Sequence, residues 1–183
     1  MDAALKPLRH GLTLLCVVAG TLLARPTAAQ SDSAAVERMR AAFTINFARY
    51  TSWPAPARPT EPLRLCVAAG DPQFAAFVQA NGLLVQGRPL RVQRVQRPED
   101  AAPCDVLYVG TPAAAELLRG VAGQATLTVG DAPAFLSNGG IIRLFLGDQQ
   151  MKFDVSLPQA TRSNLVLAPQ LLRLARAVDT GTP

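Results

Sequence analysis

The stretch DVLYVGTPAAAELLRGV, residues 105–121, contains the pattern that decides the fold. Its first five residues are mostly apolar and typical of a buried strand, Gly110-Thr111-Pro112 is a turn, and residues 113–121 have the composition of a helix. The order is therefore strand, turn, helix. This order is the repeating unit of α/β folds, in which helices join parallel strands.

The same order recurs on both sides of this stretch. Leu63–Ala69 is followed by Gly70-Asp71-Pro72 and a helix through Phe74 and Val78. A later apolar run ends in Gly130-Asp131, directly before another turn. We therefore predict a Rossmann-like, mostly parallel sheet with helices on both of its faces. The predicted strands are 63–69, 90–95, 105–109 and 126–129.

The C-terminal third has a different pattern. Ile141–Leu146 and Met151–Leu157 are joined by Gly147-Asp148-Gln149-Gln150, which indicates an antiparallel hairpin. A final helix is predicted from about Pro169. The residues expected on its apolar face are Leu171, Leu174, Ala175 and Val178.

The N-terminus has the three parts of an export signal. Residues 1–10 carry positive charge, residues 11–24 are apolar, and small residues precede a predicted cleavage between Ala29 and Gln30. The apolar stretch is too short for the roughly 20 residues that a spanning helix needs, and an uncleaved anchor is the alternative. We expect a periplasmic protein with residues 1–29 removed. The remaining chain is then divided into a flexible segment at 30–35, one domain at 36–178 and a tail at 179–183.

The first predicted helix carries an aromatic stripe. Apolar residues recur at spacings of three and four, and the helix should end before Trp53-Pro54. We expect this stripe to pack on the sheet, with Ile45 on the opposite side of the helix. The stripe residues are Val36, Met39, Phe43, Phe47 and Tyr50.

Two cysteines lie outside the predicted leader, Cys66 and Cys104. In an oxidising compartment such a pair is more often bridged than free, and its spacing is typical of neither a redox motif nor a zinc site. We therefore expect a disulfide bond between them.

The composition argues against catalysis. The single histidine, His10, lies in the predicted leader, so imidazole chemistry is excluded from the mature chain. Lys152 is the one lysine outside the leader, and no phosphate-loop motif is present. We expect a protein that is not an enzyme and that uses no cofactor or catalytic metal. Nucleic acid is not an expected partner either, because the protein is exported.

Polar residues follow three of the predicted strands, at Asp71, Thr111 and Asp131. The carboxyl ends of parallel strands are where open α/β sheets bind ligands, so these turns are candidate ligand-binding positions. Helix capping by the same residues is the alternative explanation.

The order of several motifs resembles the YfiR-like family of periplasmic proteins. The segment Ala41–Pro54 is similar to the family's N-terminal pattern AxxxNFxxYxxWP, and the resemblance extends over residues 36–177. The further similar segments are Leu65–Val67, Cys104–Gly110, Leu127–Asp131, Asn138–Ile142 and Leu171–Ala175.

This resemblance implies a Rossmann-like domain, a bridge between Cys66 and Cys104, and frequent homodimers. It also implies repression of an inner-membrane diguanylate cyclase, and hence cyclic di-GMP regulation, by contact with the periplasmic sensor domain of the cyclase. An outer-membrane lipoprotein would sequester the repressor. The second cysteine pair of the best-known member is missing here, so regulation through a second bridge is not expected.

The favoured function is a regulator that binds a membrane protein, and the first alternative is a small-molecule binding or sensor module. An enzyme of unrecognised type is the third hypothesis. A protein contact usually rests on a few desolvated anchors. The candidates are Tyr50, Trp53, Phe145 and Phe153, and the predicted hairpin 141–157 is the favoured surface.

Overall fold

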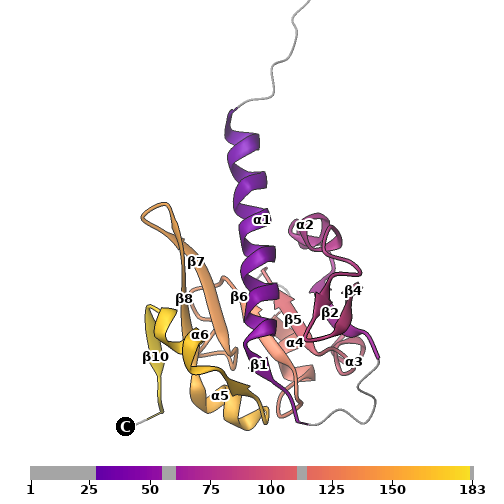
Figure 1. Ribbon diagram of the computed structural model, residues 1–183, viewed down its shortest axis with the longest axis vertical. Helices are drawn as coiled ribbons and strands as arrows, with labels where there is room; N and C mark the ends of the chain where they lie inside the picture. The colour runs from indigo at the N-terminus through magenta and orange to yellow at the C-terminus, as the bar shows by residue number, and fades with distance from the viewer. Residues whose placement is uncertain (1–27, 55–60, 111–114, 182–183) are drawn as a thin grey trace, which may run out of the picture.

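The central sheet has eight strands in the computed structural model, which describes residues 28–54, 61–110 and 115–181 (Figure 1). The strand order across this sheet is β10-β8-β7-β6-β5-β2-β4-β3. Its strands are β2 (Leu63–Ala68), β3 (Leu84–Val85), β4 (Arg88–Val95), β5 (Val106–Val109), β6 (Leu127–Gly130), β7 (Ile142–Gly147), β8 (Gln150–Ser156) and β10 (Ala177–Asp179). A separate two-stranded sheet joins β1 (Thr51–Ser52) to β9 (Val166–Leu167).

The sheet is mixed, and the predicted mostly parallel arrangement holds only in part: five of its seven strand pairings are parallel and two are antiparallel. Strands β4, β2, β5, β6 and β7 are parallel, whereas β3 and β8 pair antiparallel with β4 and β7, and β10 follows the direction of β8. A tight turn explains the reversal at one edge, because Gln86 and Gly87 both have positive φ, as a two-residue hairpin requires. The five parallel strands keep the order 2-1-3-4-5, with the switch point between β2 and β5.

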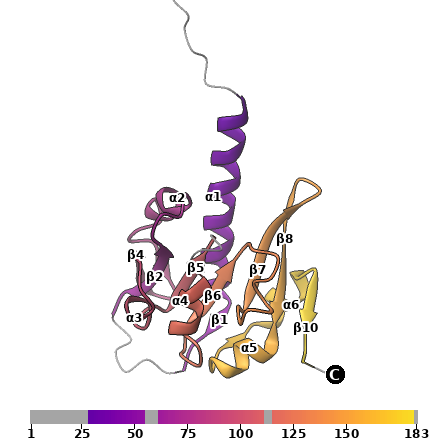
Figure 2. The ribbon, with the colours of Figure 1, turned by 180° about the vertical axis from the view of Figure 1, so that it is seen from behind.

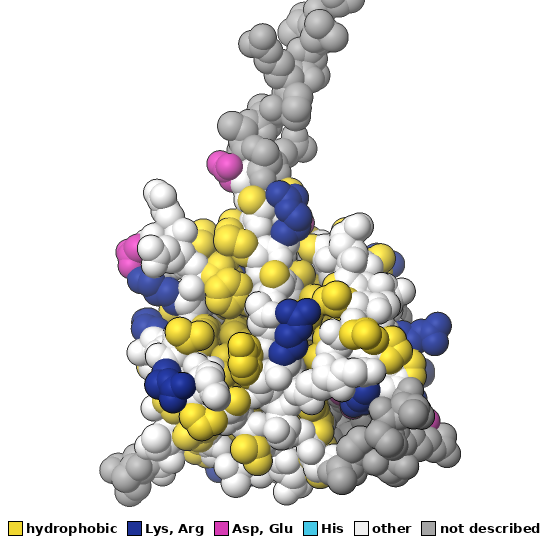
Figure 3. Space-filling model, in the orientation of Figure 1, with side chains coloured by type: hydrophobic (Ala, Val, Ile, Leu, Met, Phe, Trp, Pro, Cys, Tyr) yellow, Lys and Arg dark blue, Asp and Glu magenta, His cyan; other side chains and the backbone are white. Residues whose placement is uncertain are grey.

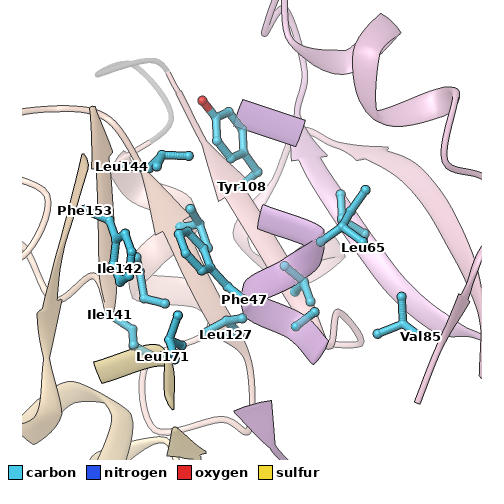
Figure 4. Packing of buried hydrophobic residues seen from close by; sticks show 14 of the residues in the cluster. Phe47, Leu65, Val85, Tyr108, Leu127, Ile141, Ile142, Leu144, Phe153 and Leu171 are labelled. Carbon is cyan, nitrogen blue, oxygen red and sulfur yellow. The ribbon is translucent and has the colours of Figure 1, made fainter. Parts of the chain in front are cut away.

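Helices cover both faces of the sheet, as predicted. Helices α1, α5 and α6 pack into the larger apolar cluster, which Figure 4 shows around Phe47, Leu127 and Ile142. Helices α3 and α4 lie on the opposite face, seen in front of the strands in Figure 2, over a smaller group that we call the back cluster. The helices are α1 (Ala28–Arg49), α2 (Phe74–Val78), α3 (Pro98–Ala101), α4 (Ala115–Gly120), α5 (Leu157–Arg162) and α6 (Pro169–Leu174).

Helix α1 differs from its prediction in two respects. It begins at Ala28, so the segment 30–35 expected to be flexible is helical. Its buried side is also rotated, because Ile45 is in the core whereas Met39 and Tyr50 are exposed. Phe43 and Phe47 of the predicted stripe do pack against the core, and small and β-branched residues of α1 complete the buried side. The residues of this buried side are Ala41, Thr44, Ile45, Phe47 and Ala48.

The end of α1 is held by the β3–β4 turn. The Gln86 side-chain amide donates hydrogen bonds to the carbonyl oxygens of Ala48 at 3.0 Å and Thr51 at 2.7 Å. Ala48 is in the last turn of α1, and Thr51 follows the helix. The carbonyl groups at a helix end have no hydrogen-bond donor within the helix, so the Gln86 amide supplies one. The contact fixes the position of α1 relative to the sheet edge.

The predicted disulfide is confirmed between Cys66 and Cys104, with Cα atoms 5.9 Å apart. Both cysteines are buried, Cys66 in the middle of β2 and Cys104 just before β5. The bond therefore joins two neighbouring strands inside the back cluster.

The C-terminal hairpin is confirmed as β7 and β8, but the final helix is shorter than predicted. It starts at Pro169 and ends at Leu174, whose side chain is exposed. Val178 lies in β10, a strand that pairs with β8, rather than on a helix face. The spacing of four residues between Leu174 and Val178 led to the wrong prediction, because the same spacing occurs when a helix ends and a strand begins.

Within the described ranges, no helix combines the length and apolar content needed to cross a bilayer. The predicted leader lies outside these ranges except for Ala28 and Ala29, and its cleavage stays a prediction.

Candidate functional site

Asp71 bridges the switch point of the sheet. It follows β2, and its carboxylate accepts hydrogen bonds from the backbone N–H groups of Gln73 and Gly110, each at 2.9 Å. Gly110 directly follows β5, the neighbouring strand. A methyl group on Gly110 would lie 2.6 Å from Asp71 Oδ2, so glycine permits this close approach. The carboxyl ends of β2 and β5 are thereby held together.

Asp131 lies two strands away from Asp71, directly after β6, and binds α1. Its carboxylate is 3.3 Å from a guanidinium nitrogen of Arg40, and each of these side chains is 21% exposed. Arg40 also acts electrostatically on Asp71. The structure therefore brings together Asp71 and Asp131, two of the three predicted ligand positions. The third, Thr111, lies outside the described residues.

The electrostatics of these groups reflect their burial. Burial raises the pKa of Asp71 above its ordinary value, and the backbone hydrogen bonds and Arg40 offset this only in part. Burial likewise raises the pKa of Asp131, with Arg40 again opposing the change. The pKa of Tyr108 is raised by burial first and then by the charge of Asp131. The edge therefore holds carboxylates that bind protons more readily than solvent-exposed ones.

Four buried side-chain atoms at this edge have no hydrogen-bond partner among the described residues. They are Tyr108 Oη, Gln73 Oε1, Arg40 Nε and Arg143 Nε. Unpaired buried polar atoms are rare in folded proteins because each loses its hydration. We call Arg40, Asp71, Gln73, Tyr108, Asp131 and Arg143 the carboxyl-edge cluster.

The sequence reasoning missed four members of this cluster. Arg40 lies on the same side of the helix as Phe43 and Phe47. A charged residue on an otherwise apolar helix side could have marked it as a candidate site residue. Tyr108 and Arg143 similarly interrupt apolar strands, whereas nothing distinguished Gln73. No group of three or more acidic, cysteine or histidine side chains in the described ranges could hold a metal ion.

A second candidate region is the exposed side of α1, which we call the α1 stripe. Figure 3 shows basic side chains on and around α1, apolar side chains along both of its sides, and acidic ones toward the edges of this face. The stripe has arginines near its two ends and no acidic residue. Its members are Arg38, Met39, Ala42, Asn46, Arg49 and Tyr50, the last directly after the helix.

Of the predicted partner-binding residues, Tyr50 belongs to this stripe and Trp53 follows it in the sequence. Tyr50 is 47% exposed and available for contact. Trp53 is half-buried, and its indole N–H donates a hydrogen bond to the Asp105 carbonyl oxygen at 3.2 Å. Trp53 therefore attaches the segment after α1 to the sheet, in addition to any surface role.

The two predicted hairpin anchors have different positions. Phe153 is 4% exposed, and its ring centroid lies 4.8 Å from that of Phe47, so it belongs to the core rather than to a partner surface. Phe145 is half-exposed between the guanidinium groups of Arg143 and Arg176, at 4.5 and 4.8 Å from its ring centroid. Both arginines pair with the buried Asp154.

A family model described as YfiR/HmsC-like matches residues 37–176, most of the chain. The chain belongs to the YfiR/HmsC-like family. The matched range begins within α1 and ends just before β10, so it includes both candidate regions. This confirms the family resemblance of the sequence.

Among solved structures, the chain is similar to a conserved domain protein from Vibrio cholerae O1 biovar El Tor strain N16961. The sequence identity is 13% and the TM-score 0.47, over 64% of this chain and 55% of that one. The match thus spans about half the length of that protein.

YfiR-like domains are periplasmic, and the buried disulfide of this chain fits an exported protein. The family generally acts with a membrane signalling partner. Family membership and the disulfide therefore both agree with the predicted export.

Proposed function

We propose that this protein is a non-enzymatic periplasmic regulator that binds the periplasmic domain of an inner-membrane signalling protein and lowers its output. The candidate partner is a diguanylate cyclase, with an outer-membrane lipoprotein as a competing partner and a homodimer as a further assembly. The observation that carries the proposal is the α1 stripe on a domain of the YfiR/HmsC-like family. The segment 1–29 would direct the protein to the periplasm.

The α1 stripe suits a protein partner of defined chemistry. Met39 and Tyr50 are large, exposed side chains, and Ala42 and Asn46 between them leave room for the backbone or side chains of a partner. Arginine and tyrosine are enriched in interface hot spots. Because the stripe contains arginines and no acid, it complements an acidic, partly apolar segment.

Regulation then follows from binding alone. A regulator that binds the inactive state of a sensor domain more tightly than the active state shifts the population toward the inactive state. A tenfold difference in affinity between the two states supplies about 1.4 kcal/mol. This mechanism needs no catalytic group in the regulator.

Site-specific photo-crosslinking in the periplasm tests the proposed surface. A photoreactive amino acid at Asn46, in the middle of the stripe, should give a covalent adduct with a membrane protein. The matched control is Glu116, 70% exposed on α4 and therefore on the other face. A membrane-protein adduct from Glu116 and none from Asn46 would place the contact elsewhere, and no adduct from either would contradict the proposal.

Charge reversal gives a second readout once the partner is isolated. Arg49→Glu places a negative charge in the stripe and should weaken binding at least tenfold, because like charges across an interface repel. Arg119→Glu on α4, at a side chain that is 76% exposed, is the control and should leave affinity unchanged. Equal effects of the two variants would show that only net charge matters.

A further inference from the structure

A partly enclosed cavity of about 260 Å³ lies between α4 and α5, at the margin of the back cluster. Both helices are in the lower half of Figure 2. Leu118 and Val121, two buried residues of the back cluster, form its apolar wall. The cavity borders β6 at Thr128, near the amino end of this strand, whereas Asp131 follows the carboxyl end. It is therefore separate from the carboxyl-edge cluster.

The loop between β6 and β7 forms another wall of this cavity. Asn138 and Gly139 of the loop line it. The Ile141 N–H donates a hydrogen bond to the buried Thr128 hydroxyl at 2.9 Å, which attaches the end of the loop to β6. Gly139 has a φ of 95°, and a methyl group there would meet no atom within 4 Å. The loop is thus fixed beside the cavity without filling it.

The charge of the cavity comes from Arg162, the basic residue in the last turn of α5. Arg162 forms no ion pair or hydrogen bond with a described residue. Arg119 also lines the cavity, but its guanidinium is already paired with the Glu116 carboxylate at 2.8 Å. Among the described residues that line the cavity, none is acidic. The cavity therefore favours an anion over a cation.

Three uncharged hydrogen-bond donors accompany Arg162. Ser163 is 8% exposed, and its hydroxyl makes no hydrogen bond to a described residue. The side-chain amides of Asn138 and Gln159 likewise have no partner in the described ranges. A hydroxyl on a residue as buried as Ser163 is normally hydrogen-bonded, so these groups are available to a ligand.

We propose that this cavity binds a small organic carboxylate with a short aliphatic or aromatic body. The planar guanidinium of arginine matches the geometry of a carboxylate. The apolar wall of Leu118 and Val121 would contact the body of the ligand, whereas inorganic phosphate would leave that wall without a partner. Pockets for drug-sized ligands measure about 300–1,000 Å³, so the volume limits the ligand to a smaller molecule. The proposal does not rest on the proposed function.

A wider and more open cavity of about 840 Å³ also has Gln159 and Arg162 in its lining. It includes Asp179, whose carboxylate would repel an anion. We therefore assign the ligand to the smaller cavity. Two hydroxyl side chains distinguish the cavities, because Ser163 lines only the smaller one and Thr161 only the wider one.

The experiment is a nuclear magnetic resonance titration of the ¹⁵N-labelled protein with sodium butyrate and sodium benzoate. We expect saturable shifts of the amide signals of Gly123 and Gly139, which line the cavity, at millimolar concentration or below. The amide signal of Gly147, in the β7–β8 hairpin, should not move. Butanol lacks the charge and inorganic phosphate lacks the apolar body, so each should bind at least tenfold more weakly than the carboxylates.

Variants identify the groups that bind. Arg162→Ala should weaken carboxylate binding at least tenfold, because hydrogen bonds to charged groups are the stronger kind. Arg173→Ala is the matched control, since Arg173 is the basic residue in the last turn of α6, and it should bind like the wild type. Ser163→Ala should weaken binding about threefold or more through the loss of one hydrogen bond, whereas Thr161→Val should have no effect.

Chemical unfolding separates loss of binding from loss of folding. Because the Ser163 hydroxyl has no partner among the described residues, Ser163→Ala should unfold at no lower denaturant concentration than the wild type. Absence of saturable shifts, equal affinity of Arg162→Ala and the wild type, or phosphate binding as tight as that of the carboxylates overturns the proposal. A larger effect of Thr161→Val than of Ser163→Ala also overturns it, because the ligand would then lie in the wider cavity. None of these results affects the crosslinking prediction at Asn46, so the two proposals fail separately.

Discussion

The back cluster and the carboxyl-edge cluster lie within a few residues of each other along the same strands, yet one consists of apolar residues and the other of polar and charged residues. The back cluster is apolar and is crossed by the Cys66–Cys104 bond. The carboxyl-edge cluster contains three charged groups that act on Tyr108, namely Arg40, Asp71 and Asp131, and four unpaired polar atoms. The contrast is sharp at β6, where Gly130 packs against Phe135 in the back cluster and the next residue, Asp131, binds Arg40.

This difference indicates that the back cluster stabilises the fold and that the carboxyl edge has another role. Apolar burial and a covalent bond stabilise the sheet on one face, whereas the carboxyl edge keeps buried polar atoms without a hydrogen-bond partner among the described residues. Sites that break the ordinary pairing rules are expected to be functional. The comparison predicts large stability losses in the back cluster and small ones at the carboxyl edge.

The largest effect is expected from removal of the disulfide. Cys66 and Cys104 are separated by 38 positions, and closing a loop of that length stabilises the folded state by about 4 kcal/mol in the chain-entropy model. The double variant Cys66→Ala, Cys104→Ala should lose about that much in urea unfolding. A loss below roughly 1 kcal/mol would show that packing alone holds the back cluster.

A somewhat smaller loss is expected for Gly130→Ala. The added methyl group would overlap the Phe135 ring and lie 2.6 Å from the Val109 carbonyl oxygen, and such overpacking costs about 1–3 kcal/mol. The control is Gly147→Ala, where the nearest atom is 3.2 Å away on the flexible Lys152 side chain. Differential scanning calorimetry should show a lowered midpoint for the first variant only. Equal midpoints would mean that the region around Phe135 adjusts freely.

Phe145→Ala should have a modest effect. It removes the ring between the guanidinium groups of Arg143 and Arg176, an arrangement worth about 0.5–1 kcal/mol at an exposed position. Phe145→Leu keeps most of the apolar volume and isolates the contribution of the aromatic ring. If both variants are as stable as the wild type, Phe145 is free to serve as a partner contact alone.

The smallest effect concerns pH and the carboxyl edge. Burial raises the folded-state pKa of Asp71 above 3.8, so its contribution to stability is fully present below pH 3.8 and is lost as the pH rises through the folded value. Asp71→Asn removes this titration. The stability of the variant relative to the wild type should therefore increase as the pH rises across that window, measured by urea unfolding at each pH. A relative stability that falls with rising pH would reverse the assigned sign.

The sequence predicted correctly those elements that depend on residues close together in the chain. The strand–turn–helix pattern located β2, β5 and β6, and the placement of polar residues after parallel strands brought Asp71 and Asp131 to the same edge. The remainder depended on distant contacts. The burial of Ile45 in the core and the pairing of Arg40 with Asp131 are contacts between α1 and residues far from it in the sequence. Strand β10 was not predicted because it forms through pairing with β8, a strand distant in the sequence, and its own residues carry no strand pattern.

The most direct test of the regulator account is the cellular level of cyclic di-GMP in a strain that lacks the gene. Deletion should raise the level, and periplasmic expression of the wild-type protein should lower it again. Arg49→Glu, confirmed as exported and folded, should fail to lower it, whereas Arg119→Glu should succeed. An unchanged level after deletion and after re-expression would contradict repression of a cyclase by this protein.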